Sequence, residues 1–191
     1  MPLTKDIIFG LGKALGKFHK LSSEFRPVNN KRNDWKEIAD WMEDVLSTFP
    51  NETVAKSELA ILTSYLSKLP TTKENFGLIH YNFETDNVFY DEVTKTYNTI
   101  DFDDAMYHWF ALDMVQSLDS IKEDMQEEQV EFSVNEFING YCTEYAISDE
   151  MLKFLPIFRR YDNLYGYVRI LHSVEEKWNN EPDWMINLRI K

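Results

Sequence analysis

The sequence predicts a mainly α-helical fold with one embedded β-hairpin, in the α+β class. Apolar residues recur at spacings of three and four over most of the chain, which is typical of amphipathic helices. Only residues 76–102 contain short extended runs separated by polar turns. The 191 residues are 43% hydrophobic, enough for one substantial core, and no repeat or linker divides them. We therefore expect a single domain over residues 1–191.

Helical stripes occupy the chain on both sides of the extended stretch. Before it they cover residues 7–21, 35–46 and 59–69. After it we expect helices over residues 106–118, 134–145, 150–172 and 182–188, with Asp104 as a cap for the helix that follows it. Thr4 is the expected N-cap of the first helix. This helix contains three glycines without the spacing of a phosphate-binding loop, so we attribute them to close helix packing: Gly10, Gly12 and Gly16.

Composition and charge exclude several classes of protein. The chain has 20 Lys and Arg against 33 Asp and Glu, a net charge of −13, which opposes binding to nucleic acid. The single cysteine, Cys142, cannot form an internal disulfide, and the sequence has no secretory signal pattern. No apolar run approaches the roughly 20 residues needed to span a membrane. We expect a cytoplasmic protein that binds neither nucleic acid nor membrane.

The two strands of the predicted hairpin cover residues 87–90 and 97–102. Polar residues are concentrated in and next to these strands. If the hairpin closes symmetrically about Thr94, Asn87 faces Asp101. Opposed residues have Cβ atoms about 4.5–5.5 Å apart, so an amide oxygen and a carboxylate can share one hard cation there. Mg²⁺ commonly takes one or two such protein ligands together with water and substrate phosphates. The pattern therefore suggests a Mg²⁺–phosphate site, although a bulge in the loop would shift the pairing.

A structural interpretation of the same residues stands beside the functional one. Asn and Asp at strand ends commonly form turns, and this explains Asn87 or Asp101 taken singly. The joint pattern favours a site. His80-Tyr81-Asn82-Phe83-Glu84-Thr85-Asp86-Asn87 is followed 14 residues later by Asp101, within Ile100-Asp101-Phe102-Asp103-Asp104. This combination resembles the H-x-D-x-x-x-x-N and I-D motifs of the aminoglycoside phosphotransferase and choline kinase-like family.

The flanking segments agree with this resemblance. Leu15-Gly16-Lys17-Phe18-His19 is similar to the L-G-x-x-H helix of the family, and residues 107–113 are similar to its downstream aromatic-to-Asp segment. The resemblance covers nearly the whole chain, as the C-terminal lobe of a protein-kinase-like fold. It implies ATP- and Mg²⁺-dependent phosphoryl transfer to a substrate hydroxyl. By position, Asn87 and Asp101 would hold Mg²⁺, His80 would brace the catalytic loop, and Asp113 would anchor that loop.

Two features depart from the family pattern. Asn82 stands where the family has its catalytic Asp, and an amide cannot accept a hydroxyl proton as a carboxylate does. The chain also begins almost at the helix that opens the C-terminal lobe, so we expect the N-terminal nucleotide-binding lobe to be absent. Both features predict reduced activity and weakened ATP binding. The chain is then a truncated product, a fragment or half of a split enzyme.

Three functions remain open. The first is an impaired small-molecule phosphotransferase, and the second is a non-catalytic, pseudokinase-like binding or regulatory module. The third takes residues 99–104 as the strand-then-D-x-D motif of haloacid dehalogenase-like phosphatases, which need later βα units where this chain is helical.

The acceptor and the partner are less constrained. Carboxylates alternate with aromatic residues in the last third of the chain, among them Tyr161, Tyr165 and Trp178. They suit a cationic acceptor such as an aminoglycoside, and an ordinary acidic surface explains them equally well. We also expect exposed apolar surface near the hairpin, at Leu78, Phe89 or Tyr90, and hence self-association or a partner that supplies the other lobe.

Overall fold

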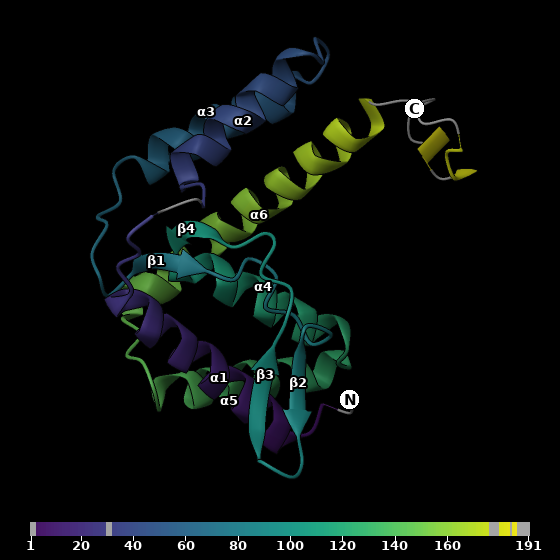
Figure 1. Ribbon diagram of the computed structural model, residues 1–191. Coiled ribbons are helices and arrows are strands. Elements are labelled where there is room, and N and C mark those ends of the chain that lie inside the picture. Colours follow the sequence, from purple (N-terminus) through teal and green to yellow (C-terminus); the bar gives the residue numbers. More distant parts are fainter. Residues whose placement is uncertain (1–2, 30–31, 176–179, 184, 187–191) are drawn as a thin grey trace. The chain divides into compact units, whose positions relative to one another are not determined.

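The computed structural model describes residues 3–29, 32–175, 180–183 and 185–186. The described chain is mostly helical and contains small antiparallel strand pairs, which confirms the α+β prediction (Figure 1). Its elements in order are α1 Lys5–Glu24, α2 Trp35–Ser47, α3 Thr53–Leu66, β1 Phe76–Ile79, β2 Val88–Asp91, β3 Thr96–Thr99, β4 Met106–Trp109, α4 Phe110–Glu123, α5 Glu127–Cys142 and α6 Asp149–Glu175. None of the helices in these ranges has the length and apolarity that a membrane span needs.

The chain divides into two compact units. The first unit comprises Met1–Trp35 and Pro70–Arg159, and the second comprises Lys36–Leu69 and Arg160–Lys191. The first unit contains all four strands together with α1, α4 and α5. Every motif residue that the sequence analysis singled out for chemistry belongs to this first unit.

Helices α1 and α5 pack closely in the first unit because glycines remove the side chains between them. A Cβ atom at Gly12 would collide with the carbonyl oxygen of Phe137, and one at Gly140 would collide with that of Phe9. Gly16 lies in the same way against the backbone of Tyr141. The structural interpretation of the α1 glycines is confirmed for these contacts. Thr4 Oγ1 also accepts a hydrogen bond from Ile7 N, at 3.4 Å, as the predicted N-cap.

Two nested strand pairs replace the single predicted hairpin. Strand β1 pairs with β4 in antiparallel register, Phe76 opposite Trp109, and the β2–β3 hairpin lies between them in the sequence. The helix predicted from Met106 therefore starts later, at Phe110, and Asp104 does not cap it. Residues 106–109 are Met-Tyr-His-Trp, whose aromatic character suits a strand once β1 is available as a partner.

The register of the β2–β3 hairpin differs by one residue from the symmetric pairing. Val88 pairs with Thr99 and Asp91 pairs with Thr96, so Asn87 stands opposite Ile100 rather than Asp101. The predicted pairing of Asn87 with Asp101 was wrong because the turn contains four residues, 92–95, and is centred between Val93 and Thr94 rather than on Thr94. Asp91 Oδ1 accepts hydrogen bonds from two backbone N–H groups of the turn, and Lys95 closes it with a φ of 56°.

Of the three apolar residues that were expected to be exposed beside the hairpin, one is exposed. The Phe89 side chain is 53% exposed, whereas Leu78 and Tyr90 are half-buried. Helix α4 is the opposite case, because all but a few of its residues are buried in the first unit. It therefore forms the central helix against which the strand ends and their connecting loops are held. Whether the exposed surface binds a partner stays a prediction.

The second unit contains the remainder of α2, helix α3 and the second part of α6. Met42, Leu46 and Leu62 are buried in it, and the Trp41 ring meets the Tyr165 ring edge-on, with centroids 5.8 Å apart. Helix α6, which corresponds to the helix predicted over residues 150–172, contains Pro156. The short helix predicted over residues 182–188 lies partly outside the described residues.

Candidate active site

The carboxylate of Asp113 holds the loop that follows β1. Asp113 lies in the first turn of α4 and is fully buried. Its Oδ2 accepts a hydrogen bond from His80 N at 2.8 Å, and its Oδ1 accepts one from Tyr81 N at 2.7 Å. Tyr81 has a φ of 52°, a conformation that a non-glycine residue keeps only when its surroundings enforce it. One side chain thus fixes two consecutive peptide groups.

His80 connects this loop to the end of strand β3. Its ring is buried, and its Nε2 lies 2.9 Å from the carbonyl oxygen of Ile100. A carbonyl only accepts, so Nε2 carries the proton and donates. The Phe102 ring contacts the His80 ring edge-on, with centroids 4.5 Å apart. His80 therefore ties residues 80–87, which we call the 80–87 loop, to the segment that carries Asp101.

The 80–87 loop closes on itself through Asn82 and Asn87. Asn87 Nδ2 donates to the carbonyl oxygen of Asn82 at 3.0 Å, and Glu84 N donates to the same oxygen at 2.9 Å. The Asn87 amide nitrogen is used within the loop, and this orientation leaves its Oδ1 for another contact. Both asparagine side chains are half-buried.

Asp101 stands beside this loop at the end of the hairpin. Ile100 N donates to Asn87 O at 3.1 Å, so Asp101 directly follows a residue that is bonded to Asn87 and to His80. Asp101 is exposed and has a φ of 61°, the second motif residue in the left-handed region. The one-residue register difference therefore moves Asn87 and Asp101 from opposed to diagonal positions and keeps them at the same end of the hairpin.

The donor chemistry of this end fits a hard divalent cation. The Asn87 Oδ1 and the Asp101 carboxylate are oxygen donors of the kind that Mg²⁺ and Ca²⁺ prefer. Over the described ranges no group of three or more His, Cys, Asp or Glu residues is arranged to hold a metal. The ion that fits here is one that completes its coordination with phosphate oxygens and water, as Mg²⁺ does.

One part of the network was missed by the sequence analysis. His19 of α1 is fully buried, and its Nε2 lies 3.1 Å from Asp113 Oδ2, while its Nδ1 lies 2.8 Å from the Tyr141 hydroxyl. Burial lowers the pKa of His19, so its imidazole is neutral at pH 7. The segment Leu15–His19 was recognised as a motif, but no signal in it indicates the partners, which lie far away in the sequence.

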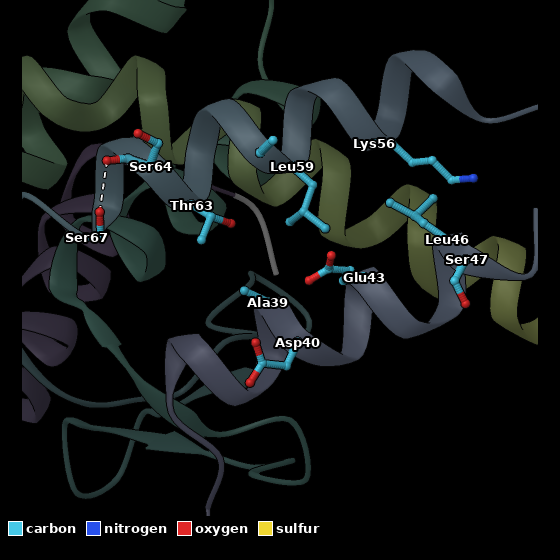
Figure 2. Close-up of a pocket in the computed structure, with 11 residues that line it drawn as sticks. Ala39, Asp40, Glu43, Leu46, Ser47, Lys56, Leu59, Thr63, Ser64 and Ser67 are labelled. Carbon is cyan, nitrogen blue, oxygen red and sulfur yellow. Dashed lines mark hydrogen bonds between the residues drawn. The ribbon is translucent and has the colours of Figure 1, made fainter.

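The second unit contains a cavity between two of its helices. It is a groove of about 800 Å³ between α2 and α3 (Figure 2). Ala39, Leu46 and Leu59 give it an apolar floor, and Asp40 and Glu43 bring carboxylates from α2. Lys56 contributes an ammonium group from α3 to the same groove.

The aromatic residues proposed from the sequence for a cationic acceptor lie elsewhere. Tyr161 and Tyr165 are both buried in the fold, and Trp178 is outside the described residues.

The fold and the site together define a class of protein. The site combines a loop held by a buried Asp from α4, a His that braces this loop, and an Asn–Asp pair at the end of the hairpin. It lies on the helical lobe of a kinase-like fold, and comparison with known proteins leads to the same class. Residues 2–151 match the family described as the phosphotransferase enzyme family. The chain belongs to this family.

Individual relatives are small-molecule kinases. The chain is 24% identical to the amicoumacin kinase of Bacillus subtilis (strain 168) over 196 residues, which cover 97% of this chain and 57% of that protein. Its fold is similar to that of an amicoumacin kinase solved with AMP-PNP, Ca²⁺ and Ami, with a TM-score of 0.79, 21% identity and coverage of 97% of this chain and 56% of that one. It is also similar to a microcompartment-associated aminopropanol kinase, with a TM-score of 0.66, 21% identity and coverage of 88% and 55%. The chain thus spans little more than half the length of these relatives.

Proposed function

We propose that this chain is the metal- and acceptor-binding lobe of a small-molecule phosphotransferase, which moves the γ-phosphoryl group of ATP to a substrate hydroxyl. One observation carries the proposal: the bond from Asn87 Nδ2 to Asn82 O uses the amide nitrogen and leaves the amide oxygen as a donor for a cation, while the bond from Ile100 N to Asn87 O holds Asn87 beside the residue that precedes Asp101. The family membership and the named activities of the relatives support the same reaction class.

Each motif residue has a role in this proposal. Asn87 and Asp101 would hold Mg²⁺, which when bound neutralises charge on the ATP phosphates. His80 braces the 80–87 loop against Ile100, and Asp113 anchors the same loop through its backbone. Asn82 orients the acceptor hydroxyl by accepting its hydrogen bond. Its amide does not take up the proton, so the chain works at a reduced rate.

Removal of the Asp101 carboxylate tests the metal site. We expect Asp101→Asn to weaken Mg²⁺-dependent binding of an ATP analogue about tenfold or more, because one of only two protein ligands loses its charge. Asp103→Asn is the matched control, since Asp103 is an exposed carboxylate two residues away. Calorimetry with and without Mg²⁺ measures both. Equal affinities for the two variants would contradict the assignment of Asp101.

A non-catalytic binding or regulatory module is the second candidate, and Asn82 is the observation that favours it. This candidate predicts Mg²⁺-dependent nucleotide binding without turnover. A phosphotransferase predicts turnover as well, so the two functions separate in a single assay of acceptor phosphorylation.

We further infer that the acceptor is a small cationic molecule. The net charge of −13 and the two carboxylates of the α2–α3 groove, Asp40 and Glu43, supply the attraction that such a ligand needs, because they outnumber the ammonium group of Lys56 in that groove. Aminoglycosides and small amino alcohols should bind with an affinity that falls as salt is raised. Glu43→Gln should weaken this binding, while Glu37→Gln on the same helix should not. Calorimetry at two salt concentrations measures the effect, and salt-independent or undetectable heat would refute a cationic acceptor.

A further inference from the structure

Tyr141 is the outermost group of the buried network that reaches the 80–87 loop. It lies on α5, is fully buried, and its hydroxyl is 2.8 Å from His19 Nδ1. The backbone of Tyr141 packs against Gly16 of α1, where any larger residue would push the two helices apart. The close α1–α5 contact thus brings this hydroxyl within hydrogen-bonding distance of His19.

The chemistry of Asp113, His19 and Tyr141 determines which group donates and which accepts in each hydrogen bond. Asp113 is a carboxylate acceptor, so the His19 Nε2 beside it carries the ring proton and donates. His19 Nδ1 is then unprotonated and accepts, and the Tyr141 hydroxyl is the donor. Burial raises the pKa of Tyr141 well above its usual value, so its hydroxyl keeps the proton that it donates. The His19 ring is stacked on Phe110, with centroids 4.3 Å apart and planes inclined by 14°.

One oxygen of the Asp113 carboxylate accepts hydrogen bonds both from His19 and from the 80–87 loop. Asp113 Oδ2 accepts from His19 Nε2 and from His80 N, while Oδ1 accepts from Tyr81 N. The direction in which His19 points its Nε2–H therefore helps to fix the carboxylate that holds both loop amides. Stacking on Phe110 restrains the tilt of the imidazole, but a 180° ring flip preserves that stack. The observed orientation is selected by two hydrogen bonds, one from Nε2 to Asp113 and one from the Tyr141 hydroxyl to Nδ1.

We propose that Tyr141 is a positioning residue for the 80–87 loop, which acts by holding the His19 ring in the orientation that presents Nε2–H to Asp113. Loss of the hydroxyl leaves Nδ1 as a buried acceptor without a donor, and the ring orientation is then held by the bond to Asp113 alone. The third hydrogen bond of Asp113 is thereby weakened, and the peptide groups of His80 and Tyr81 are held less tightly. Its consequence for catalysis rests on the function proposed above, whereas its structural part does not.

Tyr141→Phe tests this inference, with Tyr145→Phe as the control. Tyr145 lies four residues further along the chain, just beyond the end of α5. Its ring meets Phe110 edge-on, and its hydroxyl donates to the backbone oxygen of Lys73 at 3.0 Å, outside the network. We expect hydrogen exchange of the His80 and Tyr81 amides to accelerate about tenfold in Tyr141→Phe and to stay unchanged in Tyr145→Phe. Equal acceleration in both variants, or none in Tyr141→Phe, overturns the proposal.

The imidazole nitrogens give a second readout that needs no variant. In the unmodified chain, nitrogen NMR of His19 should show Nε2 protonated and Nδ1 unprotonated but hydrogen-bonded, and the Nδ1 signal should shift in Tyr141→Phe. A His19 with a protonated Nδ1 overturns the proposal even if Tyr141→Phe does not fold. Both readouts are independent of turnover, so absence of phosphoryl transfer would refute the proposed function and leave this inference standing.

Discussion

Replacing Asp113 by Asn is expected to lower the free energy of unfolding by about 3 kcal/mol, the scale for breaking a buried charged network. The carboxylate accepts two backbone hydrogen bonds and a third from His19, all in a fully buried position. An asparagine side chain offers one oxygen and one N–H₂ group. Its nitrogen must therefore face a backbone N–H, so one buried donor is left without an acceptor.

Asp119→Asn is the matched control for this change because Asp119 lies on the same helix. Its carboxylate is paired with Arg159 at 2.7 Å, and its side chain is one third exposed. We expect a loss of about 1 kcal/mol or less, the usual value of a partly solvated ion pair. Urea unfolding at neutral pH measures both variants. If the two lose the same stability, Asp113 does not anchor the loop in the way described.

Replacing Asn82 by Asp is expected to raise the rate of phosphoryl transfer about 10²–10⁴-fold, the usual contribution of a positioned general base. In the function proposed above, Asn82 stands at the position of the catalytic Asp, and its side chain is half-buried at the start of the 80–87 loop. A carboxylate there accepts the proton of the attacking hydroxyl, which an amide does not. The loop backbone needs no change, because Asn82 contributes its carbonyl oxygen to the bonds from Asn87 and Glu84.

The control for added charge is Asn98→Asp. Asn98 is an exposed residue of β3, paired with Phe89, so its substitution introduces the same carboxylate away from the site. Phosphorylation of a panel of amino alcohols and aminoglycosides, assayed with Mg²⁺ and ATP, gives the two rates. Nucleotide binding with no turnover in either variant would rule out the phosphotransferase function for this chain and favour the binding or regulatory module.

The helices show what local pattern can predict. The apolar stripes over residues 7–21 and 59–69 correspond to α1 and α3. They could be predicted because the pattern of an amphipathic helix depends only on residues that are close together in the sequence. Strand β4 was missed because it has only four residues, too few for the spacing of apolar residues to distinguish a strand from a helix. Its partner, β1, is separated from it by the whole hairpin.

The hairpin register shows a different limit. The strands were located from their apolar runs, but the pairing depends on the turn. Two hydrogen bonds to Asp91 Oδ1 and the left-handed conformation of Lys95 form a turn of four residues, 92–95, which is centred between Val93 and Thr94. Nothing in the composition of the loop reveals this choice, so the expected Asn87–Asp101 pairing was one residue out of register.

By itself, the sequence determined the family, the helical class and the positions of the motif residues, because spacing within a loop is a local property of the chain. Only the tertiary structure decided how these residues are held. Tyr141 and His19 are separated by 122 residues, and His19 and Asp113 by 94. Their contacts exist because glycines let α1 and α5 approach closely and because α4 is buried beside them. Hydrogen bonds depend on distance and direction in space, and those come from packing over the whole unit.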